Sequence, residues 1–178
     1  MNKKVAILAT NGFEESELRS PKEYLEKEGY TAHIVSLKKG SIKSWNLKDW
    51  GKDYPVDFAL NEVTSKDYDA LVIPGCVINP DKLRTEENAM TFVKGFFKDK
   101  KPVAAFAEGT HILINAEVVK GREVTSDLST KRDLVNAGAI WKDQEVVVDK
   151  GLVTGQTLKD LPTFNKRMVE EINGGKYS

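Results

Sequence analysis

The sequence has little of two reactive residue types: one cysteine, Cys76, and two histidines in 178 residues. A single cysteine excludes an intrachain disulfide and any zinc site built on several cysteines. We therefore expect a reducing compartment, and we predict a cytoplasmic protein. The lysines at positions 3 and 4, followed by the apolar residues 5–9, superficially resemble a signal peptide. That apolar run is too short for the hydrophobic region of a signal peptide.

Long apolar runs and net charge are missing as well. No run approaches the roughly 20 residues of a membrane-spanning helix, so we predict no membrane partner. Lys plus Arg and Asp plus Glu both number 27, which gives a net charge of zero. This balance argues against general nucleic-acid binding, which needs a basic surface. Glycine-rich phosphate loops are also absent, and we predict no cofactor.

Short apolar runs alternate with longer amphipathic ones, as in a parallel sheet that is covered on both faces. We predict a single domain over residues 1–178 with a flavodoxin-like three-layer α/β sandwich, a mostly parallel central sheet and a small added hairpin. The predicted strands are 5–9, 31–37, 71–73 and 103–107, with shorter extended segments at 123–126, 145–148 and 152–154. The predicted helices are 81–98, 129–137 and 162–172, with an earlier one between Gly12 and Gly29.

Four local features refine this prediction. Pro21 should either kink the first helix or stand near its true start. The segment 38–55 has no clear period, and we expect an ordered surface excursion in which Trp45 and Trp50 pack locally. Asp160 should cap the last helix. His33, within the second strand, is expected to be a packed residue and not a ligand.

Ligands of open parallel sheets bind beyond the carboxyl ends of the strands. In this sequence those ends are residues 10–17, 74–81, 107–111 and 126 onward. At the third, an apolar run stops at Ala107-Glu108-Gly109 and a helix follows at once. This pattern is typical of a nucleophile elbow, a tight turn that lifts one side chain above the sheet. Here that side chain is the methyl group of Ala107, which cannot attack a substrate.

The segment Lys101 to Gly109 resembles the elbow of the ThiJ/PfpI family, whose members are known as intracellular proteases and, in some cases, glyoxalases or deglycases. The resemblance spans essentially the whole chain. Its other matching segments are 12–18, 68–75, 79–84, 118–122, 125–126, 133–134, 136–139 and 145–149. The resemblance implies one ThiJ/PfpI-like domain of the class I glutamine amidotransferase-like type.

The resemblance also shows where this chain departs from the family. The family's elbow reads Cys-His-Gly, so the nucleophile and its histidine correspond to Ala107 and Glu108, followed by Gly109. The family usually has proline where this chain has Thr110. Because an engineered knockout of the cysteine would not explain Glu108 or Thr110, natural divergence is the better account.

Other positions of the family's site are partly retained. The Gly-Gly whose N–H groups are expected to hold an oxyanion corresponds to Gly75-Cys76. The carboxylate that is thought to tune the family's cysteine corresponds to Glu17. The acid that a neighbouring subunit contributes corresponds to Asp81, so the resemblance implies a homodimer or larger ring with Asp81 near the interface.

We therefore predict a catalytically impaired homologue that binds a small molecule or has a stress-related role. Its pocket is expected to be lined by Glu17, Gly75, Cys76, Ala107, Glu108 and Gly109. An alternative is an active hydrolase or glyoxalase in which Cys76 is the nucleophile and Glu108 or His111 the base. Against this, nearby carboxylates raise the pKa of a thiol, and an unpaired cysteine is commonly buried and inert.

Two further alternatives involve carboxylates. Glu17 and Glu108 could share a proton and act as general acid and base, because neighbouring carboxylates split their pKa values. Glu108 and His111 stand three positions apart and, with Glu17, could hold a divalent metal ion. We predict no metal, since such two-residue spacings are common by chance. Contact between the carboxylates of Glu17 and Glu108 would favour either alternative.

Overall fold

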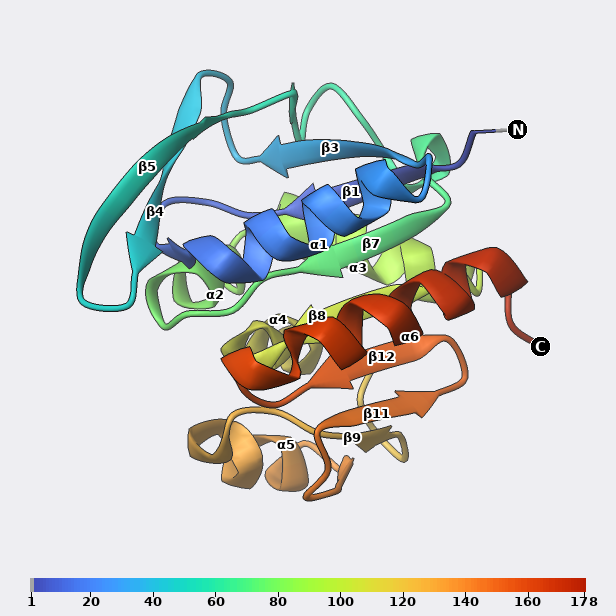
Figure 1. Ribbon diagram of the computed structural model, residues 1–178. Helices are drawn as coiled ribbons and strands as arrows, with labels where there is room; N and C mark the ends of the chain where they lie inside the picture. The colour runs from blue at the N-terminus through green and yellow to red at the C-terminus, as the bar shows by residue number, and fades with distance from the viewer. Residues whose placement is uncertain (1) are drawn as a thin grey trace.

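The computed structural model describes residues 2–178 as a seven-stranded sheet with helices on both faces (Figure 1). The strand order is β11-β12-β8-β7-β1-β3-β6, and every neighbouring pair is parallel except β11 and β12. The strands are β1 (Lys4–Leu8), β3 (Thr31–Ser36), β6 (Phe58–Ala59), β7 (Ala70–Ile73), β8 (Val103–Phe106), β11 (Val146–Asp149) and β12 (Leu152–Gly155). The predicted fold class is confirmed.

Helices α1 (Glu15–Lys27) and α6 (Leu161–Gly174) cover one face of the sheet, and α3 (Glu87–Lys98) covers the opposite face. The remaining helices are α2 (Ile78–Leu83), α4 (Thr110–Asn115) and α5 (Lys131–Asn136). Alternate residues of β1 enter different cores: Val5 and Ile7 pack with α1 and α6, whereas Ala6 and Leu8 pack with α3. Because both faces are buried, the strands are continuous apolar runs in the sequence.

The excursion at 38–55 is a β-hairpin, which the sequence did not indicate. Strands β4 (Ser41–Asn46) and β5 (Asp49–Pro55) form a small sheet with β2 (Phe13–Glu14) and project beyond the carboxyl ends of the parallel strands (Figure 1). Both faces of β5 are largely exposed, so no apolar alternation marks the strand. The rings of Trp45 and Trp50 pack edge to face with centroids 5.5 Å apart, which confirms the predicted local packing.

A buried carboxylate attaches the hairpin to the first helix. Glu15 accepts hydrogen bonds from Ser44 Oγ and from the hydroxyl of Tyr54, each at 3.1 Å. Burial, followed by the contact with Glu15, raises the pKa of Tyr54 to about 12. The hairpin is therefore held at the edge where ligands of parallel sheets bind.

Several predicted elements differ from the observed ones. The predicted helix 81–98 is two helices, because the chain between them includes Glu86 in an extended conformation. Pro21 lies inside α1, six residues after its first residue, and not near its start. The β11–β12 hairpin is an edge of the main sheet and not an addition to it.

The chain after α4 has less regular secondary structure than predicted. The predicted helix at 129–137 is the 3-10 turn η3 (Leu128–Thr130) followed by α5, and β9 (Glu123–Val124) pairs with β10 (Ile140–Trp141). The other 3-10 turns are η1 (Ser65–Asp67), η2 (Ala107–Gly109) and η4 (Leu158–Asp160). Asp160 precedes α6, but its carboxylate accepts from Thr157 in the preceding turn, so the predicted side-chain cap of α6 is wrong. Within residues 2–178 no helix combines the length and apolar character needed to cross a membrane.

The turn after β8 is packed tightly against the end of β7. A Cβ atom added to Gly109 would lie 2.8 Å from the backbone oxygens of both Ile73 and Pro74. We predict that Gly109→Ala lowers the free energy of unfolding by about 1–3 kcal/mol, since backbone must shift to admit the methyl group. Chemical denaturation measures this loss.

Gly174→Ala is the matched control, because no atom of residues 2–178 lies within 4 Å of the added Cβ and the residue ends a helix. It should leave the free energy of unfolding unchanged or raise it slightly. Equal stability of the two variants would mean that the turn is not constrained as described.

Candidate functional site

The predicted elbow has the expected backbone geometry. Strand β8 ends at Phe106, the 3-10 turn η2 follows at once, and α4 begins at Thr110. Ala107 is 4% exposed and has φ of 48°, a conformation that is uncommon for residues other than glycine. The strained turn of a nucleophile elbow is therefore present, with a methyl group in the nucleophile's position.

The end of β7 lies beside this turn, and its N–H groups are occupied by carboxylates. The backbone N–H of Gly75 donates to Glu17 Oε2 at 2.6 Å, and that of Cys76 donates to Glu108 Oε2 at 3.3 Å. These are the N–H groups that the family resemblance predicts to bind an oxyanion. Cys76 itself has φ of 74°, in the left-handed region that favours glycine.

The carboxylates of Glu17 and Glu108 converge on one point. Their Oε2 atoms lie 2.6 and 3.1 Å from the position of a Cβ added to Gly75. Burial raises the pKa of Glu17 well above its ordinary value, and the nearby charge of Glu108 raises it further. Ionisation of Glu17 is therefore disfavoured both by its burial and by the neighbouring carboxylate.

A cavity of about 540 Å³ lies over the elbow and contains most of the predicted pocket. Glu17, Cys76, Ala107 and Glu108 line it, whereas Gly75 and Gly109 are not among its lining residues. The further lining residues are Glu14, Trp45, Val77, Asp127, Gln156, Thr157, Leu158 and Lys159. The predicted strand ends included the regions of Glu14 and Asp127. The sequence did not indicate that the hairpin and the segment after β12 would also contribute residues to the cavity.

Glu14 is a functional candidate that the sequence analysis did not single out. The side chain belongs to β2, is 8% exposed and lines the cavity. Its Oε1 atom is buried without a hydrogen-bond partner among residues 2–178. Burial is the main cause that raises the pKa of this carboxyl group.

Cys76 faces the cavity but is not activated as a nucleophile. The thiol is half-buried, and burial raises its pKa; the charges of Glu108 and Glu14 raise it further. A higher pKa leaves a smaller thiolate fraction, which is the reactive form. The environment therefore disfavours the alternative in which the nucleophile has moved to Cys76.

His111 does not join the two glutamates. Its Nε2 lies 3.1 Å from Asp133 Oδ2 on α5, and the residue does not line the cavity. In the described part of the chain, no three His, Cys, Asp or Glu side chains are grouped to hold a metal ion. The hypothetical ligand set of Glu17, Glu108 and His111 is thus not assembled, because the imidazole pairs with Asp133.

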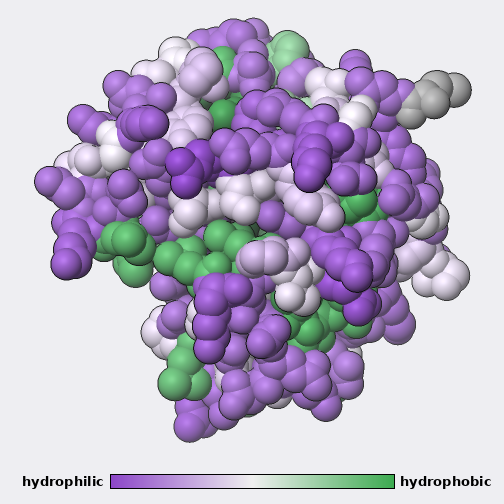
Figure 2. Space-filling view, in the orientation of Figure 1, coloured by the Kyte–Doolittle hydropathy of each residue, from purple (hydrophilic) through white to green (hydrophobic). Residues whose placement is uncertain are grey.

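Two other predicted positions lie outside the cavity. His33 Nδ1 is 3.3 Å from the hydroxyl of Tyr68 and its ring packs against Phe58, which confirms a packed residue. Asp81 is exposed on α2. Figure 2 shows an apolar area over α2, where Val77 and Ile78 are exposed. A subunit interface near Asp81 remains a prediction.

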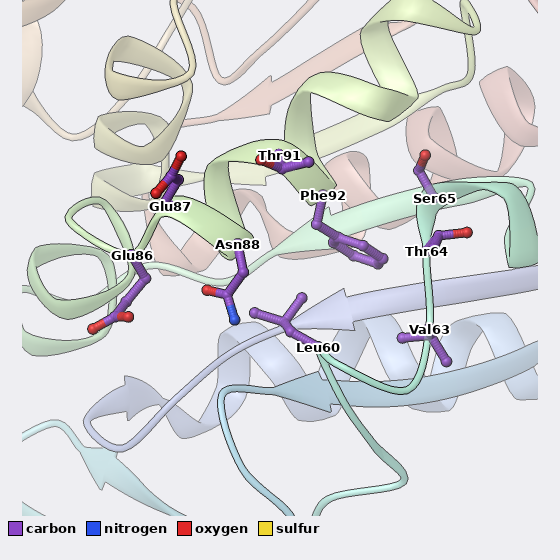
Figure 3. A pocket seen from close by; sticks show the side chains of 9 residues that line it. All are labelled: Leu60, Val63, Thr64, Ser65, Glu86, Glu87, Asn88, Thr91 and Phe92. Atoms are coloured by element: carbon purple, nitrogen blue, oxygen red, sulfur yellow. The ribbon is translucent and has the colours of Figure 1, made fainter.

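A larger cavity of about 620 Å³ lies between the segment after β6 and the first turns of α3. In Figure 3, Asn88 and Phe92 extend from α3 toward Leu60, with Glu86 and Glu87 to one side. Among the described residues, no cysteine, histidine or lysine lines it, and the elbow is not part of it. The smaller cavity is the better candidate because it combines the elbow with carboxyl groups of raised pKa.

The raised pKa of Glu17 predicts a pH effect on stability. Its stabilising contribution is complete below the pKa of the unfolded chain and is lost as pH rises through the raised pKa of the folded state. We predict that Glu17→Gln makes the free energy of unfolding fall less steeply with pH over that window. Chemical denaturation across a pH series measures the slope.

The control is Glu23→Gln, which changes an exposed glutamate on the same helix and should keep the wild-type slope. A Glu17→Gln profile that runs parallel to the wild-type profile would contradict the assigned environment.

Comparisons with known proteins agree with this architecture. The family model described as DJ-1/PfpI family matches residues 3–171. "Putative cysteine protease YraA" of Bacillus subtilis is 39% identical over 93% of this chain and 96% of its own length. "Protein/nucleic acid deglycase 2" of Escherichia coli is 40% identical over 93% of this chain and 95% of its own.

Among solved structures, a two-domain protein of Anabaena variabilis with DJ-1/ThiJ/PfpI-like and ferritin-like domains is 29% identical, with a TM-score of 0.90. The match covers 97% of this chain but 48% of that longer one. Drosophila melanogaster DJ-1β, at 24% identity, has a TM-score of 0.89 over 98% of this chain and 92% of its own, which supports the fold. The chain is a member of the DJ-1/PfpI family.

Proposed function

We propose that this chain is a non-catalytic member of its family, a protein that binds a small molecule in the elbow cavity without covalent chemistry. The observation that carries the proposal is Ala107, whose methyl group occupies the strained turn after β8. A neighbouring base cannot create a nucleophile there, because the side chain has no atom that can attack.

The surroundings of the elbow support the same proposal. The N–H groups of Gly75 and Cys76 already donate to Glu17 and Glu108, so they are not available to a developing oxyanion in this arrangement. The cavity itself, at about 540 Å³, is large enough for a metabolite-sized molecule. A binding role needs such a cavity but needs no nucleophile.

The second candidate is an enzyme of a different mechanism. The convergence of Glu17 and Glu108 favours general acid–base catalysis, because two neighbouring carboxyl groups can hold one proton between them. The names of relatives, a cysteine protease and a deglycase, make peptides and carbonyl adducts the substrates to examine. Cys76 would be the nucleophile of the remaining enzymatic alternative.

We predict that the purified protein turns over neither methylglyoxal nor peptides. The double variant Ala107→Cys/Glu108→His should gain measurable turnover, because it restores the thiol and the histidine to an elbow whose backbone is already shaped for them. Steady-state assays of both proteins with the same substrates measure this difference.

Cys76→Ala and Glu17→Gln distinguish the alternatives. Turnover by the natural chain that Cys76→Ala abolishes would assign the nucleophile to Cys76. Turnover that survives Cys76→Ala but is lost in Glu17→Gln would assign acid–base chemistry to the carboxyl pair. Either result would overturn the non-catalytic proposal.

A further inference from the structure

We propose that Trp45 is the specificity-determining residue of the elbow cavity, and that the cavity binds a small molecule through an aromatic group of that molecule. This inference rests on the proposed function, because it names the ligand class of a cavity that binds without covalent chemistry. It is carried by the position of one indole ring, by the way the β4–β5 hairpin fixes that ring, and by the apolar side chains that line the same cavity.

The side chain of Trp45 presents carbon surface to the cavity. The residue lines the cavity and is half-buried. Its one polar side-chain atom, Nε1, donates to the backbone oxygen of Leu47 at 3.2 Å. Because an indole ring has no other hydrogen-bonding atom, the part that remains for a ligand is the π surface of the ring. The contact that this wall favours is therefore aromatic packing and not a hydrogen bond.

The neighbouring strands hold this ring in place. Trp45 pairs with Trp50 across the hairpin, and the planes of their two rings are nearly perpendicular, at 83°. On its other side Trp45 pairs with Glu14 of β2, which also lines the cavity. The hydrogen bond to Leu47 fixes the direction of the indole N–H. A wall that is ordered before the ligand arrives lowers the entropic cost of binding.

A β-bulge in the hairpin lies immediately before Trp45. The pairing register shifts there, so residues 51 and 52 of β5 stand opposite Ser44 alone. Ser44 Oγ lies 2.9 Å from a backbone oxygen of the bulge and 3.1 Å from the carboxylate of Glu15. A Cβ atom at Gly51 would collide with that carboxylate and with the Ser44 hydroxyl. Bulges redirect the side chains next to them, and this one is attached to the helix that carries Glu17.

Apolar side chains from three other segments line the same cavity. They are Val77 at the start of α2, Ala107 at the elbow and Leu158 after β12. Val77 is exposed and Leu158 is half-buried, so both offer apolar surface that a ligand removes from water. Such surface alone suits any hydrocarbon group. The indole ring of Trp45 adds a preference for an aromatic group, because aromatic pairs gain energy beyond the burial of their area.

The test is an NMR titration of the full, isotope-labelled chain with phenylethanol, and separately with cyclohexylethanol as a saturated probe of the same carbon skeleton. Both probes are uncharged, so the carboxyl groups of the cavity favour neither. Phenylethanol should shift the indole N–H resonance of Trp45 and leave that of Trp141, which does not line the cavity, unchanged. It should bind about threefold or more tightly than cyclohexylethanol, although cyclohexylethanol is the more hydrophobic compound.

Three results would overturn the proposal. They are equal or tighter binding of cyclohexylethanol, shifts that leave out Trp45, and no binding of phenylethanol. Shifts confined to residues around Phe92, in the larger cavity, are a case of the second result.

Variants assign the preference to the ring. Trp45→Leu should give the two probes equal affinity, because leucine keeps apolar surface but has no π surface. Trp45→Phe should retain the preference for phenylethanol. Trp141→Leu is the matched control outside the cavity and should keep the preference of the natural chain. A preference that survives in Trp45→Leu would contradict the assignment, and the titration of the natural chain decides the proposal if that variant does not fold.

The two proposals fail in different ways. Turnover of methylglyoxal or peptides by the natural chain would overturn the non-catalytic function, whichever probe binds. An inert natural chain that does not prefer phenylethanol would leave the non-catalytic function standing and would reject the ligand class.

Discussion

Repulsion among carboxylates that share one cavity is the constraint on which the site depends. Glu17 is fixed by the N–H of Gly75 and lies close to Glu108, which is held by the N–H of Cys76. Burial and mutual charge raise the pKa of Glu17, so the cavity retains protons more strongly than an exposed surface does. A site of this kind disfavours a thiolate and an oxyanion, and it accommodates protons or cations.

The same constraint explains why the replacements at the elbow are compatible with one another. A cysteine thiolate at position 107 would add negative charge next to these carboxylates, whereas the methyl group of Ala107 adds none. Glu108 in turn occupies the N–H of Cys76 and thereby satisfies a backbone donor at the end of β7. Ala107 and Glu108 are thus consistent parts of one electrostatic environment.

Much of this architecture could be predicted from the sequence, because its signals are local. Continuous apolar runs marked the buried strands, and the abrupt change at residues 107–109 marked the elbow. The β4–β5 hairpin could not be predicted, since its exposed strands lack alternation and its attachment depends on Glu15, distant in sequence. The pairing of His111 with Asp133 and the unpartnered oxygen of Glu14 likewise arise from tertiary contacts.

The most direct measurement is an NMR titration of the glutamate side-chain carboxyl carbons in the folded protein. The account predicts that Glu17 titrates at clearly higher pH than glutamate in an unstructured peptide, and that the Glu17 curve shifts when Glu108 is replaced by glutamine. Titration of Glu17 in the range of an exposed glutamate, with no response to Glu108→Gln, would contradict it. That outcome would mean that the carboxyl groups at the elbow do not share one environment.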